Sequence, residues 1–136
     1  MKKIQLLIYG LLLSLLTVHA ADNTTRWHTY LAMYNTIAVA EAENNVYAVA
    51  DGTLYSYGKS DDNIRVYSRQ TGLSDSDVRL IRYNASTRTL VIAYANGNID
   101  LMTSDGIYNL PFLKNTTNIQ DKTLNAIDLS GDRAYL

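Results

Sequence analysis

Residues that could carry out catalysis are scarce in this chain. It contains no Cys, and its two histidines are His19 and His28, of which only His28 lies outside the apolar N-terminal segment. A Cys–His pair or a His-based metal cluster therefore cannot form, and a Ser–His–Asp site would depend on His28 alone. We predict that the chain is not an enzyme, has no catalytic residue, and binds no metal ion or cofactor.

Two short acidic runs could offer oxygen ligands to a calcium ion, which binds about six to eight oxygens. They are Asp61-Asp62-Asn63 and Asp75-Ser76-Asp77. Both lie in predicted polar loops, where Asp, Asn and Ser are common because their side chains hydrogen-bond to nearby backbone groups. We therefore predict that these residues form turns and hold no metal.

Tyrosine is abundant, with eleven in the chain. Aromatic rings on strands usually pack between sheets and keep the hydroxyl at a polar edge. They can also form a platform on which a carbohydrate stacks, but we predict core packing for those that fall on predicted strands. These are Tyr47, Tyr55, Tyr57, Tyr67, Tyr94 and Tyr108.

The N-terminal residues have the layout of a secretory signal peptide. Lys2 and Lys3 precede an apolar run from Ile4 to Val18, and Val18-His19-Ala20 suits a cleavage site before Ala21. The run is about 15 residues long, short of the roughly 20 that span a bilayer. We predict a chain exported to the periplasm, outer membrane or cell surface that does not span the membrane after cleavage.

Charge excludes one class of partner. The formal net charge is −1, from 12 basic and 13 acidic residues, and the basic residues form no run. A nucleic-acid backbone would find no complementary surface, so we predict no nucleic-acid partner.

An internal repeat supplies the elements that would position these side chains. Val46–Tyr55 superimposes on Val91–Asp100 at an offset of 45 residues, and Ala134-Tyr135 matches Val91-Ile92 at an offset of 43. Short strand-like runs punctuated by Asp-Gly and Asn-Gly, with a period in the forties, are typical of the four-stranded blade of a β-propeller.

The pattern predicts each strand in turn. Asp51-Gly52 indicates a two-residue type I′ hairpin, and Asn96-Gly97 turns the chain at the corresponding place in the next unit. The predicted strands are 37–40, 46–50, 53–57 and 64–67, then 78–83, 89–95, 98–102 and 107–110, and finally 124–129 and 133–136.

We therefore predict an all-β fold, a partial β-propeller of about two and a half four-stranded antiparallel blades, preceded by a signal-peptide helix. The predicted boundaries are a signal peptide over 1–20, an N-terminal arm over 21–36 and a propeller fragment over 37–136. The arm would either add a strand to the final blade or pack through Trp27 and Tyr30. Its blades would cover 37–73 and 78–110, with a partial blade over 124–136. We expect the front part of a longer protein, with an exposed, association-prone flank.

Several segments resemble known propellers. Gly72-Leu73-Ser74, followed by Val78, is similar to the repeat of the two-component-regulator propellers of Bacteroidetes-type bacteria. The start of the PorZ-like family of the type IX secretion system is more similar still. That resemblance covers most of the chain after the signal and rests on Trp27 with Tyr30, Tyr67-Ser68, Gly72-Leu73-Ser74-Asp75, the run Leu90–Leu101, Asp121-Lys122 and Ala134-Tyr135-Leu136.

The resemblance implies a non-catalytic scaffold or binding module at the cell surface. Its implied partners are the proteins of a secretion complex that processes cargo and attaches it to anionic lipopolysaccharide, and the lipopolysaccharide glycan itself. An alternative is the periplasmic sensor propeller of a hybrid two-component system that binds a carbohydrate. A transmembrane helix and kinase encoded downstream would favour the sensor. The ligand, the binding surface and the total blade number stay open.

Overall fold

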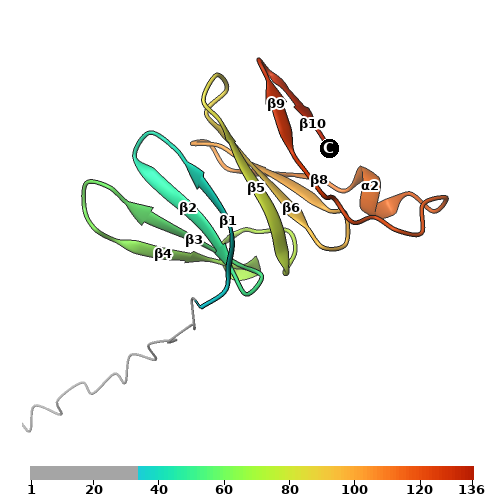
Figure 1. Ribbon diagram of the computed structural model, residues 1–136, viewed down its shortest axis with the longest axis horizontal. Coiled ribbons are helices and arrows are strands. Elements are labelled where there is room, and N and C mark those ends of the chain that lie inside the picture. Colours follow the sequence, from blue (N-terminus) through green and yellow to red (C-terminus); the bar gives the residue numbers. More distant parts are fainter. Residues whose placement is uncertain (1–33) are drawn as a thin grey trace, which may run out of the picture. The chain divides into compact units, whose positions relative to one another are not determined.

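Two four-stranded antiparallel sheets make up most of the structure. The computed structural model describes residues 34–136 (Figure 1). Within each sheet the strands follow chain order. Blade 1 consists of β1 (Thr36–Glu41), β2 (Asn45–Ala50), β3 (Thr53–Gly58) and β4 (Ile64–Tyr67), and blade 2 of β5 (Val78–Asn84), β6 (Thr89–Tyr94), β7 (Ile99–Met102) and β8 (Ile107–Leu110). The prediction of an all-β partial propeller with four-stranded antiparallel blades is confirmed.

A two-stranded sheet follows blade 2. It pairs β9 (Asp128–Ser130) with β10 (Arg133–Tyr135). The predicted strand over 124–129 is wrong in its first half, because regular pairing starts only at Asp128. Leu124 and Ile127 still pack into the core, but they stand three residues apart, whereas a strand places every second residue on one face.

The connections between sheets hold two short helices that the sequence did not predict. They are η1 (Arg69–Thr71), between blades 1 and 2, and α2 (Phe112–Asn115), after blade 2. From residue 34 onward, no helix is long and apolar enough to cross a membrane. The predicted signal peptide, His28, and the arm residues Trp27 and Tyr30 lie outside the described residues.

The two Gly-containing hairpins differ in length, although their sequences align. Asp51 (φ 48°) and Gly52 (φ 73°) form a two-residue turn between the paired residues Ala50 and Thr53. In blade 2 the loop has three residues, 95–97: the Tyr94 N–H bonds to the Asn98 carbonyl at 3.0 Å and the Gly97 N–H to the Tyr94 carbonyl at 3.1 Å. With Gly97 at φ 79°, this is a type I turn with a bulge.

The extra loop residue displaces the repeat by one position along β6. Val49 pairs with Leu54 in blade 1, and the matching pair in blade 2 is Ala93 with Ile99. The superposition at an offset of 45 places Val49 on Tyr94, and is therefore wrong by one residue for this strand. Since side chains alternate between faces, that shift turns Tyr94 toward blade 1, into the core cluster that also contains Val49.

Blade 2 is packed on both faces of its central strand. One cluster lies between the two blades and contains Ala40, Val49, Leu54, Leu73, Val78, Ile81, Leu90, Ile92 and Tyr94. The other lies on the far side of β6 and contains Val91, Ala93, Ile99 and Ile127. This explains the continuous apolar run of β6, because a strand buried on both faces has no solvent side.

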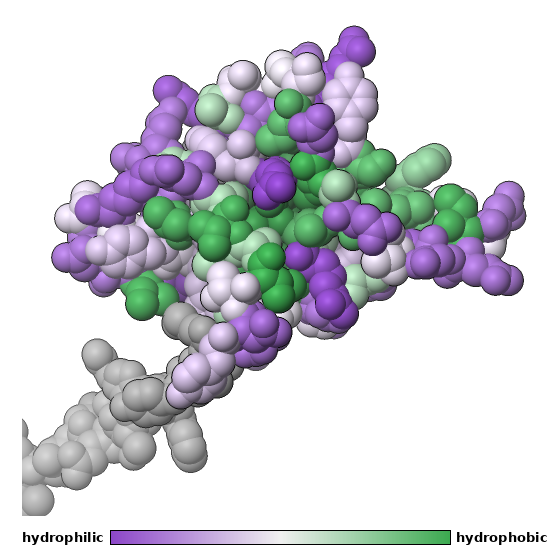
Figure 2. Space-filling view, in the orientation of Figure 1, coloured by the Kyte–Doolittle hydropathy of each residue, from purple (hydrophilic) through white to green (hydrophobic). Residues whose placement is uncertain are grey.

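Blade 1 has an apolar outer face, the face that points away from blade 2. Residues paired across antiparallel strands share a face, so the pairs Val39–Ala48, Tyr55–Val66 and Tyr57–Ile64 define it. Val39, Tyr57, Ile64 and Val66 are 54%, 42%, 57% and 39% exposed. In the view of Figure 2, hydrophobic residues likewise gather in a band across the middle of the described part. Exposed apolar surface of this kind favours association between molecules.

We expect Ile64→Lys combined with Val66→Lys to suppress self-association of the chain. The two charges would have to be buried for outer faces of different molecules to pack together, which is unfavourable. Sedimentation velocity across a concentration series should show association at least about tenfold weaker than in the wild-type chain, a difference of about 1.4 kcal/mol. Tyr108→Lys on β8, also at an exposed site, is the control. Equal association of all three proteins would contradict the role of this face.

Candidate binding cleft

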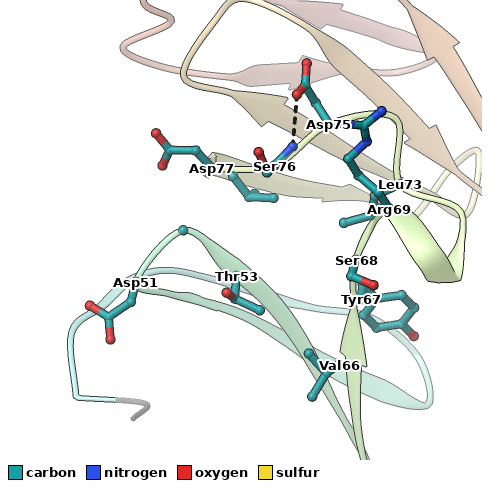
Figure 3. Close-up of a pocket in the computed structure, with 12 residues that line it drawn as sticks. Asp51, Thr53, Val66, Tyr67, Ser68, Arg69, Leu73, Asp75, Ser76 and Asp77 are labelled. Atoms are coloured by element: carbon teal, nitrogen blue, oxygen red, sulfur yellow. Dashed lines mark hydrogen bonds between the residues drawn. The ribbon is translucent and has the colours of Figure 1, made fainter. Parts of the chain in front are cut away.

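A cleft of about 510 Å³ opens where blade 1 meets the connection to blade 2 (Figure 3). We call it the interblade cleft. Its volume lies within the range of ligand pockets, about 300–1,000 Å³. It is lined by the Asp51-Gly52 turn and Thr53, by the end of β4, and by the connection that leads into β5; the lining residues include Val66, Tyr67, Ser68, Arg69, Leu73, Asp75, Ser76, Asp77 and Val78.

The backbone fixes the position of the cleft walls. The Val78 N–H donates to the Gly52 carbonyl at 2.8 Å, joining the turn to the connection. A Cβ atom on Gly52 would lie 3.0 Å from Asp77 Oδ1 and 3.3 Å from Asp77 Cα, so Asp77 would have to shift, and the φ of 73° at Gly52 also favours glycine. The backbone of Asp77 is in the left-handed region, with φ 59°. Asp and Asn adopt this conformation more readily than most residues.

The cleft presents hydrogen-bonding groups without a catalytic pair. Carboxylates come from Asp51 and Asp77, hydroxyls from Ser68 and Tyr67, and a guanidinium from Arg69. Asp77 Oδ1 lies 3.5 Å from Arg79 Nε, and both side chains are more than half exposed, so this ion pair adds little stability. Residues 34–136 contain no His or Cys, and among them no three acidic side chains are grouped to hold a metal. The arrangement suits binding of a polar ligand or peptide.

Next to the cleft, and sharing Asp75 with it, lies a partly buried network that we call the polar hub: Ser74, Asp75, Tyr94, Asn96, Asn98, Asp100, Asn109 and Lys114. Its centre is Asp100, which is fully buried. Asp100 accepts hydrogen bonds from the Ser74 N–H at 2.8 Å, from the Tyr94 hydroxyl at 2.5 Å and from Asn109 Nδ2 at 2.8 Å. The hub therefore ties the connection that lines the cleft to β6, β7 and β8.

Asp75 joins the hub to the second connection. It accepts hydrogen bonds from Lys114 Nζ and Asn96 Nδ2, each at 2.6 Å. Burial alone would raise the pKa of Asp75, but the hydrogen bonds from Lys114, Asn96 and the Ser76 N–H outweigh it and lower the pKa to about 2. For Tyr94, burial and then the hydrogen bond to Asp100 raise the pKa of the hydroxyl. At neutral pH Asp75 is therefore a carboxylate and Tyr94 a neutral phenol.

We expect Asp75→Asn to destabilise the chain at pH 7 by about 1–2 kcal/mol after screening at the half-exposed Lys114 is allowed for. The folded-state pKa of Asp75 is depressed, so its contribution is present above the unfolded value near 3.8 and is lost as the pH falls toward about 2. Urea unfolding should therefore show wild type and variant converging between pH 4 and pH 2. Asp51→Asn on the cleft rim is the control, and a difference independent of pH would contradict this account.

The acidic runs singled out in the sequence do not come together. Asp61 accepts from Asn63 Nδ2 at 2.8 Å, and Asp62 accepts from the Tyr57 hydroxyl, so this run stabilises its own loop. In the second run, Asp75 points into the hub while Asp77 stands at the cleft. Asp100 was not among the candidate residues predicted from the sequence. The only sequence sign of its role is a carboxylate inside an otherwise apolar strand.

The tyrosines divide between core and surface. Tyr94 and Tyr55 are buried, at 0% and 5% exposure, as predicted, whereas Tyr57 and Tyr108 are 42% and 55% exposed. Tyr47 and Tyr67 are half-buried, with ring centroids 6.3 Å apart. Core packing is therefore wrong for Tyr57 and Tyr108. The alternation of side chains along a strand shows which face each one lies on. It does not show whether a neighbouring sheet covers that face.

Comparison with known proteins gives a consistent match. The family model for the N-terminal β-propeller domain of PorZ, a type IX secretion system protein, matches residues 46–136. Among solved structures, PorZ of Porphyromonas gingivalis, described as an essential bacterial surface component of that system, shares 42% sequence identity with a TM-score of 0.73. The match covers 77% of this chain and 14% of that one. No curated protein matches.

Two further solved structures share the fold alone. They are extracellular domains of BT4673 from B. thetaiotaomicron, described in one case as a one-component system and in the other as a hybrid two-component system. Identities are 14% and 12%, both TM-scores are 0.55, and each match covers 68% of this chain and 13% or 12% of the other.

Proposed function

The chain belongs to the family of PorZ N-terminal β-propeller domains, and from this membership we propose that it is a non-catalytic binding module of an exported, surface-associated type IX secretion apparatus. The observation that carries the proposal is the 42% identity to PorZ over 77% of the chain. The predicted signal peptide supports export.

The interblade cleft supports binding over catalysis. It combines carboxylates, hydroxyls and one guanidinium, and its lining residues include no His, Cys or Lys that would activate a nucleophile. Propellers host unrelated functions, so this local chemistry carries more weight than the fold. We assign the cleft to contacts with a protein of the secretion complex.

Cargo processing and cargo attachment would involve the whole secretion protein, of which this chain corresponds to one part. The chain spans about a seventh of the PorZ chain that it matches, which is covered to 14%. We propose that the module contributes a contact surface to cargo processing and to attachment of cargo to anionic lipopolysaccharide.

Surface fractionation and cross-linking test this function. The full chain, tagged at its C-terminus, is expressed in a type IX-secreting bacterium. We expect it outside the cytoplasm, cross-linked to components of the secretion complex, with fewer cross-links for Arg69→Glu in the cleft and unchanged cross-links for Arg82→Glu on β5. Retention in the cytoplasm, or cross-links equal in both variants, would contradict the proposal. Capture of a membrane kinase would instead support the sensor alternative.

A further inference from the structure

Asn96 is the only asparagine of the chain that is followed by glycine. Such a pair can modify itself, because the backbone nitrogen of the glycine lies close enough to attack the side-chain carbonyl carbon of the asparagine. Glycine has no side chain that would hinder the attack. In the loop between β6 and β7, Asn96 is exposed and Gly97 is buried. The loop therefore leaves the side chain open to water and encloses the attacking nitrogen.

Hydrogen bonds occupy both groups that would have to react. Asn96 Nδ2 donates to Asp75 Oδ2 at 2.6 Å, and Asn96 Oδ1 accepts from the Asn98 N–H at 3.0 Å. The Gly97 N–H donates to the Tyr94 carbonyl at 3.1 Å. The attack requires the Gly97 nitrogen to give up its proton and Asn96 Nδ2 to leave. Because the folded hub holds both the proton and the leaving nitrogen, it opposes the reaction.

The connection after blade 2 covers the attacking nitrogen. A Cβ atom on Gly97 would lie 2.8 Å from Lys122 Cβ and 3.2 Å from Leu113 Cγ, so these residues pack directly on Gly97. Lys114 Nζ holds the connection in place by donating to Asp75 Oδ2 at 2.6 Å, and Lys122 Nζ donates to the Lys114 carbonyl at 2.5 Å. Asp75 therefore holds both the leaving amide and the segment that covers the attacking nitrogen.

We propose that Asn96-Gly97 is a self-modification site that the polar hub keeps unreactive and that converts permanently once the hub opens. The Gly97 nitrogen bonds to Cγ of Asn96 and loses its proton, and Nδ2 leaves with one added proton as ammonia. Water then adds to one of the two carbonyl carbons of the five-membered imide and breaks its bond to nitrogen, which regains a proton. The product at position 96 is aspartate or isoaspartate.

The modified side chain cannot rebuild the hub. Its carboxylate has no N–H to donate to Asp75, and two carboxylates at this separation repel each other. Isoaspartate also adds one methylene to the backbone of a loop whose length sets the register of β6 and β7. The reaction therefore records each opening of the hub and leaves the connections around it loosened. This device is independent of the proposed secretion role.

Mass spectrometry of the purified full chain tests the site. After incubation at mildly alkaline pH, the tryptic peptide 89–114 should gain the mass of an amide-to-acid conversion, which fragmentation should locate at Asn96. Asn98 and Asn109 lie in the same peptide and precede larger residues, so they are internal controls and should stay unmodified. Conversion at these two residues at the same rate as at Asn96 would overturn the proposal.

Asp75→Ala removes the acceptor that holds both the amide and the connection. We expect it to convert Asn96 at least about tenfold faster than the folded wild type does, toward the rate of wild type unfolded in urea. Ile81→Val, which removes a buried methyl group from the core between the blades, is the control for destabilisation elsewhere and should stay within about twofold of the wild type. Equal rates in the two variants, or a folded wild type as fast as the unfolded chain, would overturn the proposal.

Two further variants keep the test decisive if Asp75→Ala does not fold. Lys114→Met releases the connection alone and should raise the conversion rate by a smaller factor. Asn96→Asp reproduces the product, and backbone hydrogen exchange over residues 73–78, which contribute to the interblade cleft, should be at least about tenfold faster than in the wild type. Asn44→Asp, at an exposed position between β1 and β2, is the matched control. Equal exchange in Asn96→Asp and Asn44→Asp would reject the loosening of the hub.

Discussion

Gly97→Ala should destabilise the chain by about 3 kcal/mol, as much as the loss of a buried core side chain. Gly97 has φ 79°, and holding a non-glycine residue in that region costs about 1–2 kcal/mol. An added Cβ atom would also lie 2.8 Å from Lys122 Cβ and 3.0 Å from the Lys122 carbonyl oxygen, and overpacking of this kind costs about 1–3 kcal/mol. Urea unfolding of the purified chain measures the sum.

Gly131→Ala separates the two causes. Gly131 has a similar φ of 59°, but nothing lies within 4 Å of an added Cβ atom. We expect it to lose only the conformational part, about 1–2 kcal/mol. Equal losses in the two variants would show that the connection carrying Lys122 moves away freely and that the close approach at Gly97 has no energetic consequence.

Asp100→Ala should cost about 2–4 kcal/mol, because it leaves two donors around a buried site without an acceptor, each at about 1–3 kcal/mol before relaxation. These donors are the Ser74 N–H and the Tyr94 hydroxyl, whereas Asn109 Nδ2 keeps the Asn98 and Ile99 oxygens as acceptors. Asp105→Ala, in an exposed turn, is the control and should change the free energy of unfolding by less than about 0.5 kcal/mol.

Tyr94→Phe tests whether the hub acts as a unit. It removes one donor and keeps the ring, so we expect a loss of about 1–2 kcal/mol. In a double-mutant cycle with Asp100→Ala, the losses should be non-additive by at least about 0.5 kcal/mol. Additive losses, or an Asp100→Ala variant as stable as the wild type, would show that solvent enters the site and replaces the missing acceptor.

The strands could be predicted because their signals are local. Alternating apolar residues bounded by Asp-Gly, Asn-Gly and polar loops indicated all eight strands of the two complete blades, and Asp51-Gly52 indicated its turn type. The three-residue loop of blade 2 could not be predicted in this way, since Asn-Gly occurs in both kinds of hairpin. Its conformation includes a tertiary partner: Asn96 donates to Asp75 at 2.6 Å while its oxygen accepts from the Asn98 N–H at 3.0 Å.

The cleft and the hub were beyond prediction for a related reason. Ser74 and Asp100 are 26 residues apart in the chain, and they meet only because one connection passes over the end of the second sheet. The carboxylates of Asp75-Ser76-Asp77 were noticed, but their separate roles depend on Lys114 and Gly52, which reach them from other elements. A spacing pattern records neighbours along the chain, whereas these contacts are made between elements.

The unequal hairpins restrict how such a repeat can be copied in a genome. If recombination joined the two units at the shared Asp/Asn-Gly dipeptide, β2 would inherit the three-residue loop, or β6 the two-residue turn, and the register with the following strand would slip by one. Each side chain that had faced one neighbour would then face the other. Viable exchanges between units must therefore carry a strand and its hairpin together, which places their crossover points in the long connections around Ser68–Asp77 and Pro111–Ile127.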